Sequence, residues 1–160
     1  MTESRTAEDG RRDLAAMIVP LGRALMAAEA PVLRAHDVSM WAYSVLLALG
    51  EEPVRTQNAL AQAIGADKTR IIGVLDGLQE RGLIERRPDP GDRRVRLLSL
   101  TPEGRRLRDS VQAGIREREN HLLARLPAAD RAAFLRALRT LSSLPEEEIV
   151  DPASPRRRSD

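Results

Sequence analysis

Residues 56–100 constrain the fold most, because two short amphipathic segments joined by a glycine turn are followed at once by a hairpin signal. Thr56 can cap the first predicted helix, which Gly65 ends, and Asp67 can cap the second, with Gly82 just beyond its last turn. Two short helices with a tight turn that contains glycine are typical of a helix-turn-helix.

The hairpin signal is the turn sequence Pro-Asp-Pro-Gly-Asp at residues 88–92, which lies between two β-compatible runs at 83–87 and 93–100. Proline, aspartate and glycine favour a tight turn between paired strands. A hairpin directly after the second helix is a wing. The pattern therefore predicts a mainly α fold with a small β-hairpin wing, in which residues 51–100 form a winged helix-turn-helix domain.

The region before this domain predicts two further helices. Apolar residues recur at helical spacing from Leu14, although Pro20 and Pro31 predict either a kinked helix or two shorter ones over residues 12–35. Ser39 can cap a second helix that ends near Gly50. We interpret residues 11–50 as an N-terminal dimerisation helix and a linker helix, and expect the polar residues 1–10 to be disordered.

The region after the wing predicts two more helices within residues 101–145, separated by the break at Leu126-Pro127. Residues 146–160 hold three glutamates and three consecutive arginines and are expected to be a disordered tail. The outer helices have apolar stripes that can pack across a two-fold axis, which predicts a homodimer. The residues expected at this dimer interface are Leu14, Ile18, Leu21, Phe134, Leu138 and Leu141.

Composition excludes several classes of protein. Aromatic residues are only 2% of the chain, too few for the stacking platforms that bind single-stranded nucleic acid. The absence of cysteine excludes disulfides, cysteine-ligated zinc and thiol redox sensing. Residues 1–54 hold 5 basic and 8 acidic residues, whereas residues 55–108 hold 12 and 7. An anionic partner would therefore be attracted to the middle third of the chain.

The second helix of the motif has an outward face suited to the major groove. At 100° per residue, its apolar face leaves Thr69 and Gly73 pointing outward, with Arg70 and Ile72 on the flanks. We predict that Lys68 and Arg70 contact phosphate or guanine, that Ile72 contacts a thymine methyl group, and that Gly73 permits close approach. The alternative is that these charges are merely solvated.

The wing concentrates arginines that suit a narrow, negative minor groove. We expect Asp92 to orient the wing by holding the guanidinium of Arg94 before DNA arrives. The alternative is a solvated charged turn. The wing arginines predicted to bind DNA are Arg86, Arg93, Arg94 and Arg96.

Three motifs in order carry a family resemblance: Leu-x-x-x-Gly-Leu-Ile-x-Arg from Leu78, Asp-x-Arg from Asp92, and Leu-Thr-x-x-Gly from Leu100. Between about residues 56 and 106 the chain resembles the MarR (multiple antibiotic resistance regulator) family. The resemblance implies a homodimeric repressor or activator that binds a pseudo-palindromic double-stranded DNA operator and responds to a small, often phenolic or anionic, ligand. It also implies that Arg94 is the minor-groove arginine and Asp92 its partner.

The resemblance places an effector pocket for a small organic ligand near Met40, Trp41 and Tyr43, and the favoured alternative is that these side chains pack in the core or at the dimer interface. A metal-responsive alternative would use His36, Asp37 and His121, but the histidines lack metal-ligand spacing, so we predict no metal and no cofactor.

Other function classes find less support. No nucleophile or phosphate-binding motif is present, so the chain is not expected to be an enzyme. With no apolar run approaching roughly 18 residues, we expect a cytoplasmic protein with no membrane partner. A protein-interaction module is the competing interpretation, but it gives no reason for the wing arginines.

Overall fold

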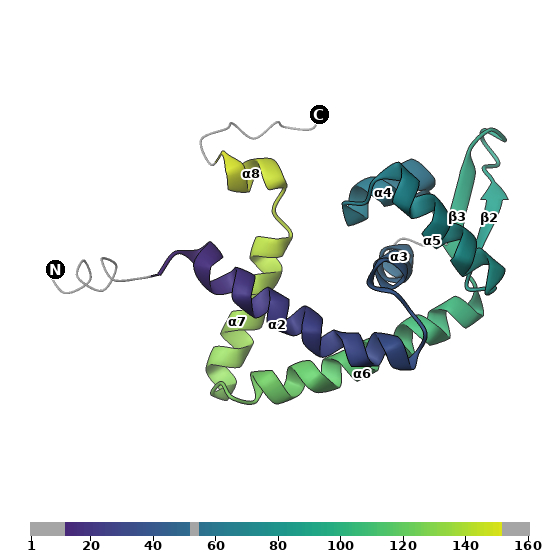
Figure 1. Cartoon of the computed structure of the whole chain (residues 1–160). Helices are drawn as coiled ribbons and strands as arrows, with labels where there is room; N and C mark the ends of the chain where they lie inside the picture. The colour runs from purple at the N-terminus through teal and green to yellow at the C-terminus, as the bar shows by residue number, and fades with distance from the viewer. Residues whose placement is uncertain (1–11, 52–54, 152–160) are drawn as a thin grey trace, which may run out of the picture. The chain divides into compact units, whose positions relative to one another are not determined.

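The computed structural model describes residues 12–51 and 55–151, and these form the mainly helical fold with a β-hairpin wing that the sequence predicts (Figure 1). The predicted disorder of residues 1–10 lies outside the described residues. The elements in chain order are α2 (Leu14–Ala35), α3 (Met40–Glu51), β1 (Arg55–Thr56), α4 (Gln57–Ile64), α5 (Lys68–Glu80), β2 (Ile84–Pro88), β3 (Arg96–Leu100), α6 (Pro102–Leu123), α7 (Ala128–Ser142) and α8 (Glu146–Val150).

The helix-turn-helix consists of α4 and α5, and both predicted caps are present. Thr56 Oγ1 accepts a hydrogen bond from the amide of Ala59 at 3.2 Å, and Asp67 Oδ1 accepts one from the amide of Arg70 at 2.8 Å. Gly65 has a φ of +65°, the left-handed conformation that ends α4 at little steric cost. These local contacts fix where each helix begins and therefore which side chains α5 presents.

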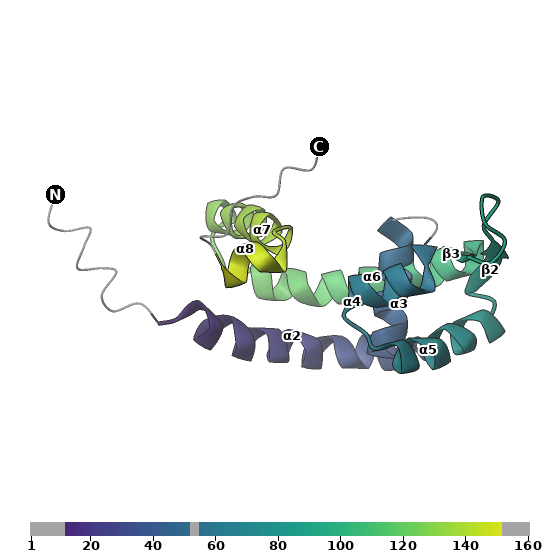
Figure 2. The ribbon, with the colours of Figure 1, turned by 90° about the horizontal axis from the view of Figure 1, so that it is seen from above.

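The wing belongs to a three-stranded antiparallel sheet with the order β1-β3-β2, and its hairpin extends beyond α5 (Figure 2). The sequence did not predict β1, because a two-residue strand is too short to show a pattern. The predicted strand from residue 93 is also wrong at its start. Arg93 and Arg94 lie in the loop between the strands, where the amide of Asp89 donates to the carbonyl of Val95 at 2.9 Å.

The core lies under α3, α4, α5 and the sheet, and it is aliphatic apart from Tyr43 among the described residues. Helix α3 runs through this core, because most of its side chains are buried or half-buried. The side chains with 0% exposure are Val45, Leu46, Leu49, Leu60, Leu75, Leu98 and Val111. One core therefore supports both α5 and the base of the wing.

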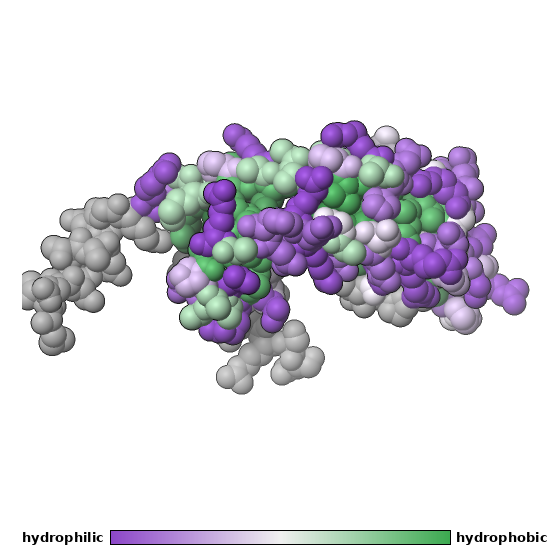
Figure 3. All heavy atoms as spheres, turned by 90° about the horizontal axis from the view of Figure 1, so that it is seen from below, coloured by the Kyte–Doolittle hydropathy of each residue, from purple (hydrophilic) through white to green (hydrophobic). Residues whose placement is uncertain are grey.

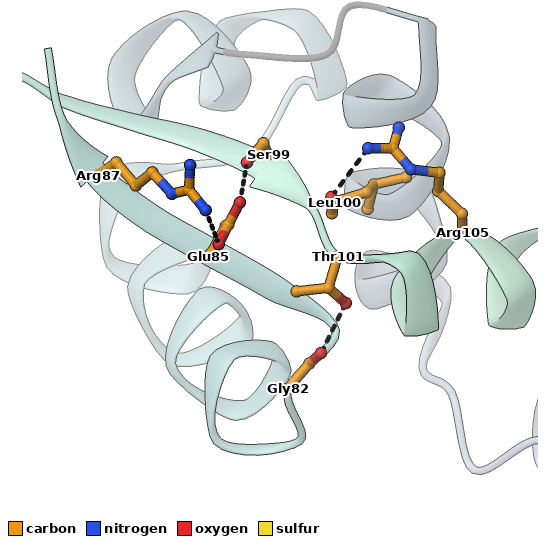
Figure 4. A network of polar contacts seen from close by, with 7 residues as sticks. All are labelled: Gly82, Glu85, Arg87, Ser99, Leu100, Thr101 and Arg105. Carbon is orange, nitrogen blue, oxygen red and sulfur yellow. Dashed lines mark hydrogen bonds and ion pairs between the residues drawn. The ribbon is translucent and has the colours of Figure 1, made fainter. Parts of the chain in front are cut away.

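The wing joins α6 through a tight backbone contact (Figure 4). Thr101 Oγ1 donates to the carbonyl of Gly82 at 2.7 Å and accepts from the amide of Gly104 at 3.0 Å. The Thr101 amide donates to the carbonyl of Leu83 at 3.1 Å. A Cβ atom on Gly104 would overlap that same carbonyl oxygen. The Leu-Thr-x-x-Gly motif thus caps α6 and allows its first turn to lie against the end of the α5–β2 connection.

Helix α2 is one continuous element despite Pro20 and Pro31, so of the two expected arrangements the single helix is the one that forms. By length and composition alone it could cross a membrane, which corrects the expectation that no segment would qualify. The charged residues Arg23 and Glu29 interrupt the apolar run in α2, which is why the sequence predicted no membrane-spanning segment. A single helix of this kind near the N-terminus is weak evidence for a membrane protein. Its N-terminal half is exposed, with Ile18 at 56%.

The corner between α2 and α3 is tied to two other helices. His36 Nδ1 lies 2.9 Å from the carbonyl oxygen of Val32, and its Nε2 lies 2.9 Å from Ser110 Oγ of α6. A carbonyl can only accept, so Nδ1 carries a proton. Asp37 has a φ of +52°, and its carbonyl accepts a 2.6 Å hydrogen bond from Arg81 Nη1 at the end of α5.

The chain from Asn120 onward forms a second compact unit, which holds the end of α6 together with α7 and α8. The predicted disorder from residue 146 is wrong for Glu146–Val150, which form α8. Pro145 at the N-cap position, followed by three glutamates in the first turn, favours a helix start. Residues 152–160 lie outside the described part of the chain.

Candidate nucleic-acid interface

Helix α5 has one buried face and one exposed face, as its sequence predicts. Ile71, Leu75 and Leu78 are 1%, 0% and 2% exposed. Ile72 is 47% exposed, so its side chain is available for an apolar contact. The other residues predicted to contact DNA from this helix, Lys68, Thr69, Arg70 and Gly73, are exposed as well. Their contacts with DNA remain a prediction.

Arg70 is held in place by two neighbours, one of which the sequence did not reveal. Its Cζ atom lies 5.3 Å from the centre of the Trp41 ring, within the range of a cation–π contact. Its Nε atom lies 3.6 Å from Asp67 Oδ2. The Asp67 pair follows the i, i+3 spacing of a helix, whereas Trp41 comes from α3 and could not be paired with Arg70 from sequence alone.

The wing presents Arg93, Arg94 and Arg96 to solvent, and none of these three makes an ion pair with another described residue. The expected contact between Asp92 and the Arg94 guanidinium is not formed. Instead Asp92 Oδ1 accepts the backbone amide of Arg94 at 3.0 Å. Aspartate readily bonds the backbone two residues on. Asp92 therefore orders the loop rather than the guanidinium.

Arg86 is placed differently from the other wing arginines, and its contact with DNA remains a prediction. Its Nη2 atom lies 2.7 Å from Asp76 Oδ1 of α5, and its side chain is only 25% exposed. Its Nε atom is buried without a hydrogen-bond partner in the described residues. The pair joins β2 to the outward side of the recognition helix, so Arg86 fixes the angle between the helix and the wing.

We expect Arg86→Ala and Asp76→Ala to lower stability less in combination than the sum of their separate effects, because each removes the same contact. Partial exposure limits the coupling to about 0.5–1 kcal/mol. Urea unfolding of both single variants and the double variant measures it. Strictly additive losses would show that the pair does not hold the wing.

A second polar contact spans the wing strands (Figure 4). Glu85 Oε2 accepts from Arg87 Nη2 at 2.9 Å, and Glu85 Oε1 accepts from Ser99 Oγ at 3.2 Å. Glu85 and Ser99 are directly paired in the sheet register. Arg87 is thus partly neutralised, which separates it from the unpaired arginines nearer the tip.

The three residues expected near an effector are partly enclosed. Met40 and Trp41 are half-buried, and Tyr43 is 6% exposed. Burial raises the pKa of Tyr43, with Glu29 of α2 as the next cause. Burial also raises the pKa of Glu29, and Glu119 of α6 raises it further. Two carboxylates from different helices therefore share the surroundings of this tyrosine.

Glu29→Gln is expected to raise the unfolding temperature at neutral pH. The folded state raises the pKa of Glu29, so folding favours the protonated form, and stability is lost as pH rises through that pKa. Glutamine removes the charge, so the gain should be present at pH 7 and shrink towards pH 4. Thermal unfolding across this range, with exposed Glu80→Gln as control, measures it. A gain equal at both pH values would contradict the assignment.

The metal-responsive alternative is not supported. The described residues contain no group of three or more histidine, aspartate or glutamate side chains arranged to hold a metal ion. His36 uses both ring nitrogens in hydrogen bonds, one with the Val32 carbonyl of α2 and one with Ser110 of α6. Asp37 follows it at the α2–α3 corner, and His121 belongs to the second compact unit.

Known transcriptional regulators resemble this chain in sequence and in fold. The HTH-type transcriptional repressor NicR of Pseudomonas putida is 32% identical over 99 residues, which cover 62% of this chain and 63% of NicR. The PcaV transcriptional regulator of Streptomyces coelicolor, solved with its natural ligand, is 31% identical, with a TM-score of 0.60 and coverage of 83% and 96%. The transcriptional repressor CouR, solved on a 23-mer DNA duplex, is 27% identical, with a TM-score of 0.70 and coverage of 81% and 92%.

The matched region spans about three-fifths of the length of the curated relatives. Residues 36–95, which run from the α2–α3 corner to the wing loop, match the MarR family. This range contains α5, the Trp41–Arg70 contact and the Arg86–Asp76 pair. The order of elements and the three motifs agree with that match, and the chain belongs to the MarR family of winged helix-turn-helix transcriptional regulators.

Proposed function

We propose that this chain is a homodimeric transcriptional regulator that binds a pseudo-palindromic double-stranded DNA operator. The observation that carries the proposal is the exposed face of α5 beside a wing on which Arg93, Arg94 and Arg96 make no ion pair with another described residue. A helix face of this kind suits the major groove, and arginine suits a narrow minor groove. The DNA duplex in the CouR structure supports the same use of the fold.

The test is selection of bound fragments from the parent genome, followed by affinity measurements at several salt concentrations. We expect two half-sites about 10 bp apart. Affinity should fall steeply with salt, because arginines release counterions from the phosphates. A flat salt dependence, or equal competition by single-stranded RNA, would contradict the proposal and favour a protein-interaction module.

We further propose that a second copy of the chain covers the apolar surfaces of α2 and α7. Figure 3 shows hydrophobic residues at the surface beside hydrophilic ones. Contiguous exposed apolar surface usually marks an interface in proteins that are not embedded in lipid. The exposed fractions of the predicted interface residues are 52% for Leu14, 56% for Ile18, 41% for Leu21, 41% for Phe134, 48% for Leu138 and 54% for Leu141.

Sedimentation at micromolar concentration, with and without lipid vesicles, tests whether a second copy of the chain or a membrane covers the apolar surface of α2. A dimer that does not bind vesicles supports the proposed interface and a cytoplasmic location. A monomer that floats with vesicles would assign α2 to the membrane. Leu138→Glu should weaken the dimer, since it places a charge on an apolar face.

We propose that a small organic effector sets operator occupancy and that the chain acts as a repressor. NicR and CouR are named as repressors, and PcaV was solved with its natural ligand. Around Tyr43, half-buried Met40 and Trp41 offer apolar and aromatic contacts to such a ligand. Deletion of the gene should raise transcripts next to the operator, and a panel of aromatic acids should be screened for release of the labelled operator. Lower transcripts on deletion would make it an activator.

A further inference from the structure

We propose that Trp41 is a positioning residue for DNA recognition, whose ring holds the guanidinium of Arg70 in the pose from which it contacts DNA. The inference rests on the proposed function, because it assigns a role in binding to a residue that does not itself lie on α5. Trp41 belongs to α3, and Arg70 is the third residue of α5.

The first support is the geometry of the pair. The Arg70 Cζ atom lies 5.3 Å from the centre of the Trp41 ring, and the Arg70 Nε atom faces Asp67 Oδ2 at 3.6 Å. The ring lies beside the guanidinium carbon, and the carboxylate lies beside Nε. Neither Nη group donates a hydrogen bond to another described residue, and the Nη groups can bind phosphate or guanine in a bidentate manner.

The second support is that the tryptophan is fixed while the arginine is exposed. Helix α3 is anchored by Val45, Leu46 and Leu49, each 0% exposed, and the Trp41 side chain is itself half-buried. The Arg70 side chain is 55% exposed. A long, exposed arginine normally loses rotamer freedom when it binds DNA. A rigid ring beneath it removes part of that loss before the DNA arrives.

Asp67 is a poor residue for testing this role, because it also caps α5 through the amide of Arg70 at 2.8 Å. Replacing it would disturb the start of the helix together with the ion pair. Trp41 makes no such cap, and its replacement leaves the Asp67 contacts in place. The experiment therefore varies Trp41 and uses Arg70 as the second site of a double-mutant cycle.

Trp41→Leu keeps an apolar side chain but removes the aromatic face, whereas Trp41→Phe keeps a ring. We expect Trp41→Leu to weaken duplex binding about two- to fivefold per half-site, the size of an exposed cation–π contact. Trp41→Phe should retain most of the affinity. In an Arg70→Ala background, Trp41→Leu should cause no further loss. Thermal unfolding of each variant identifies any loss of affinity that comes from loss of fold.

Trp41 is the chain's single tryptophan, so its fluorescence reports the contact directly. In the free protein, Arg70→Ala should change Trp41 emission and the matched Lys68→Ala should not. Two results would overturn the inference if the unsubstituted protein still binds its operator. One is an equal loss of affinity from Trp41→Leu with and without Arg70, and the other is Trp41 fluorescence that does not change in Arg70→Ala. Failure of the unsubstituted protein to bind any duplex would instead overturn the proposed function, and the positioning role with it.

Discussion

Arg94→Ala is expected to weaken operator binding by about 1–3 kcal/mol for each wing, the range for one good contact to DNA. Arg94 is exposed in the loop between β2 and β3 and pairs with no other described residue, so its charge is available to the minor groove. A dimer carries two wings, so the loss applies twice. The salt dependence should also become shallower by about one counterion per wing, which a titration with labelled duplex measures.

Arg118→Ala serves as the matched control, because it removes an exposed arginine from α6 outside the winged domain. It should leave affinity unchanged. Asp92→Ala should act as a weaker version of Arg94→Ala, since its carboxylate orders the loop amide of Arg94 rather than contacting DNA. If Arg94→Ala stayed folded and bound with full affinity, the wing would not be a DNA-reading element, and the protein-interaction module would replace it.

Gly104→Ala is expected to be the most destabilising of the small substitutions. The added Cβ would overlap the carbonyl oxygen of Leu83, which is backbone and cannot rotate away as a side chain would. Overpacking of this kind costs about 1–3 kcal/mol and occasionally more. The shift should also disturb the Thr101 hydrogen bonds at the same junction. Urea unfolding gives the loss in free energy of unfolding.

Gly73→Ala provides the matched control for the same chemical change. A Cβ at Gly73 meets nothing within 4 Å, and the residue lies inside α5. Alanine there should stabilise the fold by about 1 kcal/mol through helix propensity. It should at the same time weaken operator binding if DNA approaches this face closely. Equal stability for Gly104→Ala and the unsubstituted protein would show that the junction yields without cost.

The sequence was most informative where structure is decided locally. Thr56, Asp67 and Ser39 each act as the predicted helix cap, because a cap depends on residues only three positions apart. The turn at residues 88–92 likewise placed the hairpin. The buried and exposed faces of α5 followed from helical periodicity alone.

Contacts between distant elements could not be read in the same way. The Arg86–Asp76 pair depends on how β2 crosses α5, and the Trp41–Arg70 contact depends on the packing of α3. Their spacing in sequence has no periodicity that would single them out. Local rules also left open whether α2 would be one helix or two, and the helix continues through Pro31, which precedes the buried Val32 and Leu33.

The α2–α3 corner has a mechanical consequence. Arg81, at the C-terminal end of α5, donates a hydrogen bond to the Asp37 carbonyl of the corner. His36 of the corner forms a hydrogen bond with Ser110 of α6. Each contact is a single hydrogen bond, so neither is expensive to release. A displacement of α2 must either move the C-terminal end of α5 with it or break the hydrogen bond between Arg81 and the Asp37 carbonyl. Val32 and Leu33 bury the same end of α2 in the core, so its release would expose apolar surface as well as break hydrogen bonds.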